Sequence, residues 1–135
     1  MARGGFFSVD SLKGIHVLVL DRDPEGRELL TAVLSYCGGL VTAVASVDEA
    51  VAFLNLVKAD AMMVDASASS PAGYDLIRHV RALKPEDGGV IPAVAVGSPD
   101  EAGERALASG FNAYLTKPLD PWELCRVISN LVTTS

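Results

Sequence analysis

The run IHVLVLD, residues Ile15–Asp21, decides the fold that this sequence can adopt. Five of its first six side chains are apolar, and an acidic residue follows at once. A short strand that is apolar on both faces suits the interior of a parallel sheet, because helices cover both faces of such a sheet. We therefore expect a parallel strand over residues 15–20, with polar chemistry at its carboxyl end.

Four more apolar runs follow the same pattern, and helical signals lie between them. Asp23 before Pro24 is a helix start, and Ser46 with Glu49 has the spacing of a capping box. Alternating strands and helices indicate βαβ units, so we expect an α/β fold with a doubly wound five-stranded parallel sheet, order 2-1-3-4-5, and helices on both faces. The expected strands after the first cover residues 40–45, 61–64, 91–96 and 113–115, and the expected helices include residues 74–83, a segment that opens at Pro99–Asp100, and one that opens at Asp120–Glu123.

Length and composition indicate one domain with a sizeable core. The chain has 135 residues, of which 50% are hydrophobic. We expect the domain over residues 13–133 and a tail over residues 1–12. The pair Phe6-Phe7 lies in this tail, and we expect a disordered end, with a docking patch as the alternative.

The charge balance and the apolar runs exclude several kinds of partner. The formal net charge is −6, from 11 basic and 17 acidic residues, so we expect no binding to a nucleic acid. The apolar runs are far shorter than the roughly 20 residues that span a bilayer, and no signal peptide is evident, so we expect a cytoplasmic protein without membrane contact. Cys37 and Cys125 are expected to be buried apolar residues rather than disulfide partners or zinc ligands.

Chemistry-bearing residues stand where four of the expected strands end. Asp21 follows the first strand, Asp65 the third, Ser98 comes just after the fourth, and Lys117 follows the fifth. In an open α/β sheet, ligands bind beyond the carboxyl ends of the strands, where the strand order reverses. Two carboxylates and one ammonium in that crevice suit phosphoryl transfer with Mg²⁺. Asp65 is then the candidate acceptor of an aspartyl phosphate.

The chain resembles the receiver domain of two-component response regulators over about residues 14–133. The resemblance implies the flavodoxin-like receiver fold and a signalling protein rather than an enzyme. The arrangement looks most like the receivers attached to hybrid sensor kinases. The matching stretches are residues 17–21, 63–65, 73–77, 91–96 and 108–118, of which the last, ASGFNAYLTKP, is the most specific.

The resemblance implies a role for each site residue. Asp65 would accept a phosphoryl group from the phosphohistidine of a histidine kinase or a phosphotransfer protein, and Lys117 would bind that group. Asp21, Asp65 and the backbone carbonyl of Ser67 would hold Mg²⁺. Tyr114 would be the aromatic residue whose rotamer reports activation.

The resemblance also implies features around the site. The Lys117–Pro118 peptide bond is expected to be cis. We expect no output domain, so output would come from partner binding or from a homodimer through the face of helix four, strand five and helix five. We expect that face to include Tyr114 and Trp122, although Trp122 could equally be a packing residue.

Three positions depart from the family's pattern. Arg22 stands where a second carboxylate is usual, so we expect weaker Mg²⁺ binding than in other members. Asp23 could replace the lost ligand or serve only as a helix cap. Gly97 stands where a Ser or Thr is usual, with Ser98 next to it as a possible substitute in the switch. Ser69 stands where a proline is usual.

The departures leave more than one function open. The chain could be a phosphoacceptor receiver, or a pseudo-receiver in which Arg22 acts as a built-in cation against Asp65 and partners bind without phosphate. A remote alternative is a phosphatase resembling the haloacid-dehalogenase type, with Asp21 as nucleophile and Asp23 as acid or base. Pro24 stands where that type has Thr or Val. A flavin-type or other binding fold is also open, although no glycine-rich phosphate loop supports a nucleotide.

Overall fold

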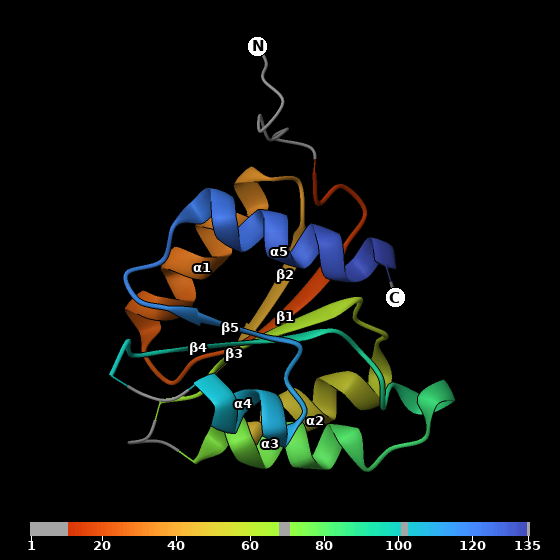
Figure 1. The fold of residues 1–135 in the computed structure, drawn as a ribbon. Coiled ribbons are helices and arrows are strands. Elements are labelled where there is room, and N and C mark those ends of the chain that lie inside the picture. The colour runs from red at the N-terminus through yellow and green to blue at the C-terminus, as the bar shows by residue number, and fades with distance from the viewer. Residues whose placement is uncertain (1–10, 68–70, 101–102, 135) are drawn as a thin grey trace.

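The structure is a computed structural model, and it describes residues 11–67, 71–100 and 103–134. Within these residues, strands and helices alternate along the chain (Figure 1). The strands are β1 (His16–Leu20), β2 (Leu40–Val44), β3 (Ala61–Asp65), β4 (Ala93–Gly97) and β5 (Ala113–Thr116). The helices are α1 (Pro24–Tyr36), α2 (Val47–Leu56), α3 (Ala72–Arg81), α4 (Gly103–Ser109) and α5 (Pro121–Thr134), with a short 3₁₀ helix over Pro85–Asp87.

The strands form one parallel sheet of order β2-β1-β3-β4-β5, as the sequence predicted. Leu20 lies beside Val64, and Asp65 lies beside Val96, so the carboxyl ends of neighbouring strands fall at the same edge. The strand order reverses between β1 and β3, since β2 lies on one side of that pair and β4 and β5 on the other. This edge is where an open sheet offers a ligand site.

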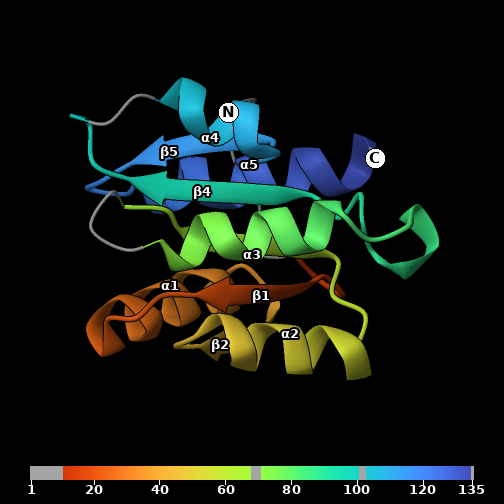
Figure 2. The same cartoon turned by 90° about the horizontal axis from the view of Figure 1, so that it is seen from below.

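Helices cover both faces of the sheet. Figure 1 shows α1 and α5 on one face, and Figure 2 shows α2, α3 and α4 lying across the other. Alternate residues of a strand point to opposite faces. Leu18 and Leu20 of β1 therefore pack with α2 and α3, whereas Val17 and Val19 pack with α1 and α5. All four side chains are at most 1% exposed, which explains why the run is apolar on both faces.

Three of the predicted helix starts are confirmed. The Asp23 carboxylate accepts a hydrogen bond from the Glu25 N–H (3.2 Å), and Pro24 is the first residue of α1. The Ser46 hydroxyl accepts from the Glu49 N–H (3.2 Å) at the start of α2. At the start of α5, the Asp120 carboxylate accepts from the backbone N–H of residue 122 (3.0 Å). These side chains partner the amide groups that a helix leaves without internal acceptors.

Three expected element starts differ from the structure by two residues or more. β4 begins at Ala93 rather than Ile91, because Pro92 has no N–H to add to the ladder. α3 begins at Ala72, two residues before the expected start. Pro99 and Asp100 form a turn rather than a helix start, and the Ser98 hydroxyl accepts from the Asp100 N–H (3.1 Å) in that turn. A serine in this role offers the backbone an alternative to helix.

The start of the described chain is tied to the core beneath α1 and α5. Leu12 is fully buried, and its N–H donates to the Cys37 carbonyl (2.9 Å). The division into a tail over residues 1–12 and a domain over residues 13–133 stays a prediction.

Cys37 and Cys125 are both buried and free, as predicted, and burial together with the neighbouring Cys37 thiol raises the pKa of Cys125. No helix in the described part of the chain is long and apolar enough to cross a bilayer.

Two leucines of α1 give a matched test of this packing. Leu34 is fully buried beneath α1, whereas Leu29 is 58% exposed. We expect Leu34→Ala to lower the free energy of unfolding by about 2–5 kcal/mol through the lost contacts and the remaining cavity. Leu29→Ala should change it by no more than about 0.5 kcal/mol. Urea unfolding followed by circular dichroism measures both, and equal losses would contradict the assigned faces of α1.

Candidate functional site

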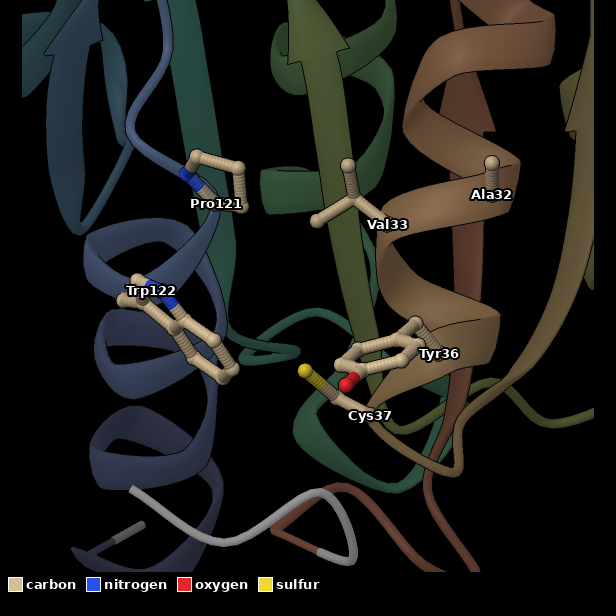
Figure 3. A pocket seen from close by; sticks show the side chains of 6 residues that line it. All are labelled: Ala32, Val33, Tyr36, Cys37, Pro121 and Trp122. Carbon is tan, nitrogen blue, oxygen red and sulfur yellow. The ribbon is translucent and has the colours of Figure 1, made fainter. Parts of the chain in front are cut away.

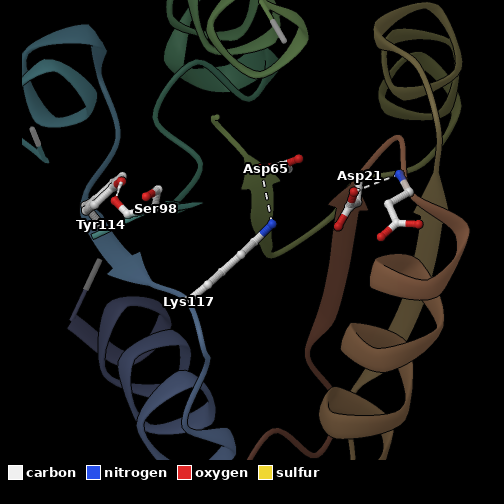
Figure 4. Close-up of polar contacts among 6 residues, drawn as sticks. Asp21, Asp65, Ser98, Tyr114 and Lys117 are labelled. Carbon is white, nitrogen blue, oxygen red and sulfur yellow. Dashed lines mark hydrogen bonds and ion pairs between the residues drawn. The ribbon is translucent and has the colours of Figure 1, made fainter. Parts of the chain in front are cut away.

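Asp65 and Lys117 form an ion pair at the carboxyl edge of the sheet. The Lys117 Nζ lies 3.8 Å from the Asp65 Oδ1, and the two side chains are 52% and 17% exposed. Figure 4 shows Lys117 extending from the end of β5 toward Asp65 at the end of β3. The Lys117–Pro118 peptide bond is cis, as expected, and the Lys117 N–H donates to the Gly97 carbonyl (2.9 Å). The loop after β5 is therefore tied to the end of β4.

Asp21 is buried against the first turn of α1. Asp21 is only 3% exposed, and its carboxylate Oδ1 accepts a hydrogen bond from the Asp23 N–H (2.9 Å). A Cβ at position 26 would overlap the Asp21 carboxylate, so only glycine fits at Gly26. Arg27 donates from Nη1 to the carbonyls of Asp21 (2.8 Å) and Arg22 (3.1 Å). These contacts fix the segment between β1 and α1.

Gly26 and Arg27 are residues that sequence reasoning missed. A glycine inside a helix costs roughly 1 kcal/mol relative to alanine, so its presence was a usable signal of close approach by another group. Arg27 offered no comparable signal, because an arginine on an amphipathic helix usually faces solvent. Both residues serve the position of Asp21 rather than the chemistry directly.

One cavity of about 360 Å³ joins the predicted residues. Asp21, Asp23, Asp65 and Lys117 all line it, so the structure brings together three of the predicted carboxylates and one ammonium, from the end of β3, the residues just after β1 and β5, and the N-cap of α1. The remaining walls are largely apolar and come from α1, the end of β4 and the loop after β5: Glu25, Gly26, Leu29, Leu30, Val96, Pro118 and Leu119.

Carboxylates are suitable ligands for a hard cation, but those of this cavity do not surround a common metal position. Carboxylate oxygens are the ligands that Mg²⁺ prefers. In the described ranges, however, no three His, Cys, Asp or Glu side chains are close enough together to hold a metal ion. Asp21 is held by the Asp23 amide, and Asp65 pairs with Lys117. The described residues therefore supply oxygen donors of the right kind, but their side chains do not surround a common metal position in this arrangement.

Tyr114 fills the space that a larger residue at position 97 would need. Its hydroxyl donates to the Ser98 carbonyl (2.7 Å). A Cβ at Gly97 would overlap the Tyr114 hydroxyl oxygen, and a Cβ at Gly103 would lie 3.0 Å from the Tyr114 Cδ2. The ring thus lies between the end of β4 and the start of α4, with a glycine on each side.

The Response regulator receiver domain profile matches residues 17–129 of the chain. The chain belongs to the response regulator receiver domain family. The uncharacterized 14.6 kDa protein in the sodA1 3' region of Leptolyngbya boryana is 36% identical over 122 residues, which cover 89% of this chain and 92% of that protein. The response regulator SaeR of Staphylococcus aureus (strain USA300) is 28% identical over 120 residues; these are 87% of this chain and 50% of SaeR, so the chain spans about half the length of that relative.

A solved receiver gives the structural comparison. The receiver domain of the sensor histidine kinase PA1611 from Pseudomonas aeruginosa PAO1, with a magnesium ion coordinated in its active site cleft, is 30% identical. The TM-score is 0.78, and the match covers 89% of this chain and 98% of that domain. A receiver domain is a signalling module rather than an enzyme, so the phosphatase alternative built on Asp21 and Asp23 is wrong.

The receiver's departures from the family pattern have visible outcomes. Arg22 is exposed and lies along a separate hollow with Ser46, Pro71 and Asp75, not in the Asp65 cavity. The cation next to Asp65 is Lys117, so the structure does not place Arg22 as its built-in counter-ion. Ser98 is absent from the cavity lining among the described residues. Ser67 comes two residues after Asp65, and Ser69 lies outside the described residues.

Trp122 lies on the α1 side of α5, away from the face of α4, β5 and α5 that was one of the two positions expected for it. Its ring contacts Tyr36 of α1, with centroids 6.2 Å apart at 69°, and it is 48% exposed. Trp122 therefore belongs to the α1 side of α5 rather than to the face of α4, β5 and α5. As the second residue of α5, Trp122 points toward α1, and the helical spacing of apolar residues in the sequence did not reveal this direction.

A double-mutant cycle tests the position of Tyr114. We expect Gly97→Ala to lower the free energy of unfolding by about 1–3 kcal/mol, because the added Cβ overlaps the Tyr114 hydroxyl. The same change in a Tyr114→Phe background should cost clearly less, since the nearest clashing atom is gone. Urea unfolding of the four proteins gives the coupling. An equal cost in both backgrounds would show that the ring does not occupy this space.

Proposed function

We propose that this chain is a phosphoacceptor receiver in which Asp65 carries the phosphoryl group. The observation that carries the proposal is the Lys117 ammonium, 3.8 Å from the Asp65 carboxylate, in a cavity that Asp21 also lines. Asp65 is mostly buried and Lys117 is half exposed. The carboxylate is therefore shielded from solvent, whereas the ammonium can move toward an incoming phosphoryl group. Membership of the receiver family supports the same conclusion.

The acceptor step needs few parts. A carboxylate oxygen of Asp65 forms a bond to phosphorus as the bond from phosphorus to the donor's imidazole nitrogen breaks, and the imidazole leaves with that electron pair. Lys117 would then pair with a phosphoryl oxygen in place of the carboxylate it now faces. The donor would be the phosphohistidine of a histidine kinase or a phosphotransfer protein.

Mg²⁺ would be held by Asp21, Asp65 and the Ser67 carbonyl, with Asp23 as a further oxygen donor. The ion would neutralise charge on the phosphoryl oxygens. Carboxylates of residues 21, 23 and 65 line one cavity, and the PA1611 receiver carries magnesium in its cleft. Arg22 adds a positive charge in place of a ligand, so we expect the affinity for Mg²⁺ to be low.

Output would pass through Tyr114 and Ser98. The Tyr114 hydroxyl already donates a hydrogen bond to the Ser98 carbonyl, so a shift of the loop after β4 would be passed to the ring. The fourth strand ends at Gly97, without a hydroxyl, so phosphorylation would act on this loop through Lys117, whose N–H holds the Gly97 carbonyl. The signal would reach a partner, or a second copy, at the face of α4, β5 and α5.

A pseudo-receiver is the second candidate, and one observation favours it. The Asp21 carboxylate already accepts a hydrogen bond from the Asp23 amide and Asp65 is paired with Lys117, so both carboxylates have polar partners without a metal or a phosphoryl group. In that case the domain would bind partners in this form only. Labelling of Asp65 separates the two candidates.

The direct test is phosphorylation by a small donor. We expect the wild-type chain, incubated with phosphoramidate and Mg²⁺, to gain the mass of one phosphoryl group, and Asp65→Asn to gain none. Lys117→Ala should slow the labelling, because the ammonium no longer stabilises the charge on the incoming group. Intact-mass spectrometry gives both results.

Asp75→Asn is the matched control, since Asp75 is an exposed acid on α3 outside the cavity, and its labelling should equal that of wild type. Wild type that stays unlabelled, under conditions that label another receiver in the same experiment, would leave the pseudo-receiver as the function.

Arg22 gives a test of the metal's role. We expect Arg22→Asp to tighten Mg²⁺ binding at least tenfold. A tenfold change needs only about 1.4 kcal/mol, below the roughly 4 kcal/mol of a unit charge pair at 4 Å in an effective dielectric near 20. Arg22→Ala should give a smaller gain, because it removes repulsion without adding a ligand. Isothermal titration calorimetry measures each affinity, and three equal values would rule out any influence of Arg22 on the metal.

A further inference from the structure

An apolar groove separates α1 from α5 on the face of the sheet that these helices cover. Its volume is about 330 Å³, and we call it the α1–α5 groove. Figure 3 shows the rings of Tyr36 and Trp122 projecting from the two helices toward the space between them. Taken over the described residues, the lining has no charged side chain: Ala32, Val33, Tyr36, Cys37, Pro121 and Trp122.

The two aromatic rings leave much apolar surface on this groove. Tyr36 is 64% and Trp122 is 48% exposed. The rings meet edge to face, so each presents a side of its ring to a further group. Covering such apolar surface with another apolar group is favourable in free energy, because it removes the surface from water. An aromatic or large aliphatic side chain is the occupant that the lining suits.

The described chain begins next to one wall of the groove. Leu12 is fully buried, and its N–H donates to the carbonyl of Cys37 (2.9 Å), which is itself a lining residue. A chain extends at most about 3.3–3.6 Å per residue, so Phe7, five residues before Leu12, can reach up to about 17 Å from this anchor. Tyr36 adjoins Cys37 in sequence, and its ring centroid is 6.2 Å from that of Trp122.

The segment before this anchor has the matching chemistry. Residues 1–10 lie outside the described residues, and their sequence is MARGGFFSVD, with two adjacent phenylalanines and only two charged side chains. We propose that the Phe6-Phe7 pair binds in the α1–α5 groove of its own chain, against the rings of Tyr36 and Trp122.

The tether favours the chain's own segment over a second copy. A short flexible linker gives an effective concentration on the order of millimolar, whereas a second molecule must supply the same group from solution. In an extended segment, successive side chains point to opposite sides. One phenylalanine therefore enters between the helices while the other covers the outer edge of a ring. The groove becomes an intramolecular interface that external partners must displace or avoid.

Trp122 is the only tryptophan of the chain, so its fluorescence reports directly on the groove. The experiment compares acrylamide quenching of the full-length wild type with that of the double variant Phe6→Ala/Phe7→Ala. Because Trp122 is 48% exposed and the phenylalanines would cover part of that surface, we expect the quenching constant to be about twofold higher in the variant, with emission shifted to longer wavelength. Leu56→Ala, which removes an 85% exposed apolar side chain on α2, should leave quenching unchanged.

A second measurement keeps the test independent of quenching. In ¹H–¹⁵N spectra, the double variant should shift the Trp122 indole peak and the amide peaks of Tyr36 and Cys37, while peaks of α2 and α3 keep their positions. Equal quenching and unshifted peaks would overturn the proposal. It would also be overturned by protection that falls as the protein is diluted, since a second copy would then fill the groove.

Discussion

The structure depends on the burial of a parallel sheet on both faces. The strands β1, β3 and β4 are apolar on each side because helices pack against each side, so polar residues are displaced to the strand ends. All strands run in the same direction, and their carboxyl ends share one edge. Asp21, Asp65 and Lys117 therefore meet although they are far apart in sequence. The site is a consequence of the topology rather than of a local motif.

Glycines and backbone contacts then decide the orientation of the side chains at that edge. Gly26 leaves room for the Asp21 carboxylate against α1, and Gly97 leaves room for the Tyr114 ring. The absence of a hydroxyl at position 97 is therefore linked to the position of the ring, whose hydroxyl bonds the Ser98 carbonyl.

Local signals made most of the fold predictable. Apolar runs gave the strands, and Asp23, Ser46 and Asp120 gave the helix starts, because each of these effects acts within a few residues. The starts of β4 and α4 were predicted too early. Pro92 lacks the amide that a strand residue donates to the sheet, and the Ser98 hydroxyl accepts a hydrogen bond that holds a turn before α4. The direction of Trp122 depends on its packing against Tyr36 of α1, which no local period encodes.

The central claim is that Asp65 and Lys117 together bind a phosphoryl group at this edge. A crystal structure of the chain with Mg²⁺ and beryllium trifluoride, a mimic of the phosphoryl group, tests it most directly. The account requires density for the mimic bonded to the Asp65 carboxylate and in contact with the Lys117 ammonium. Density bound elsewhere, or an unmodified Asp65 still paired with Lys117 in crystals saturated with both ligands, would contradict it.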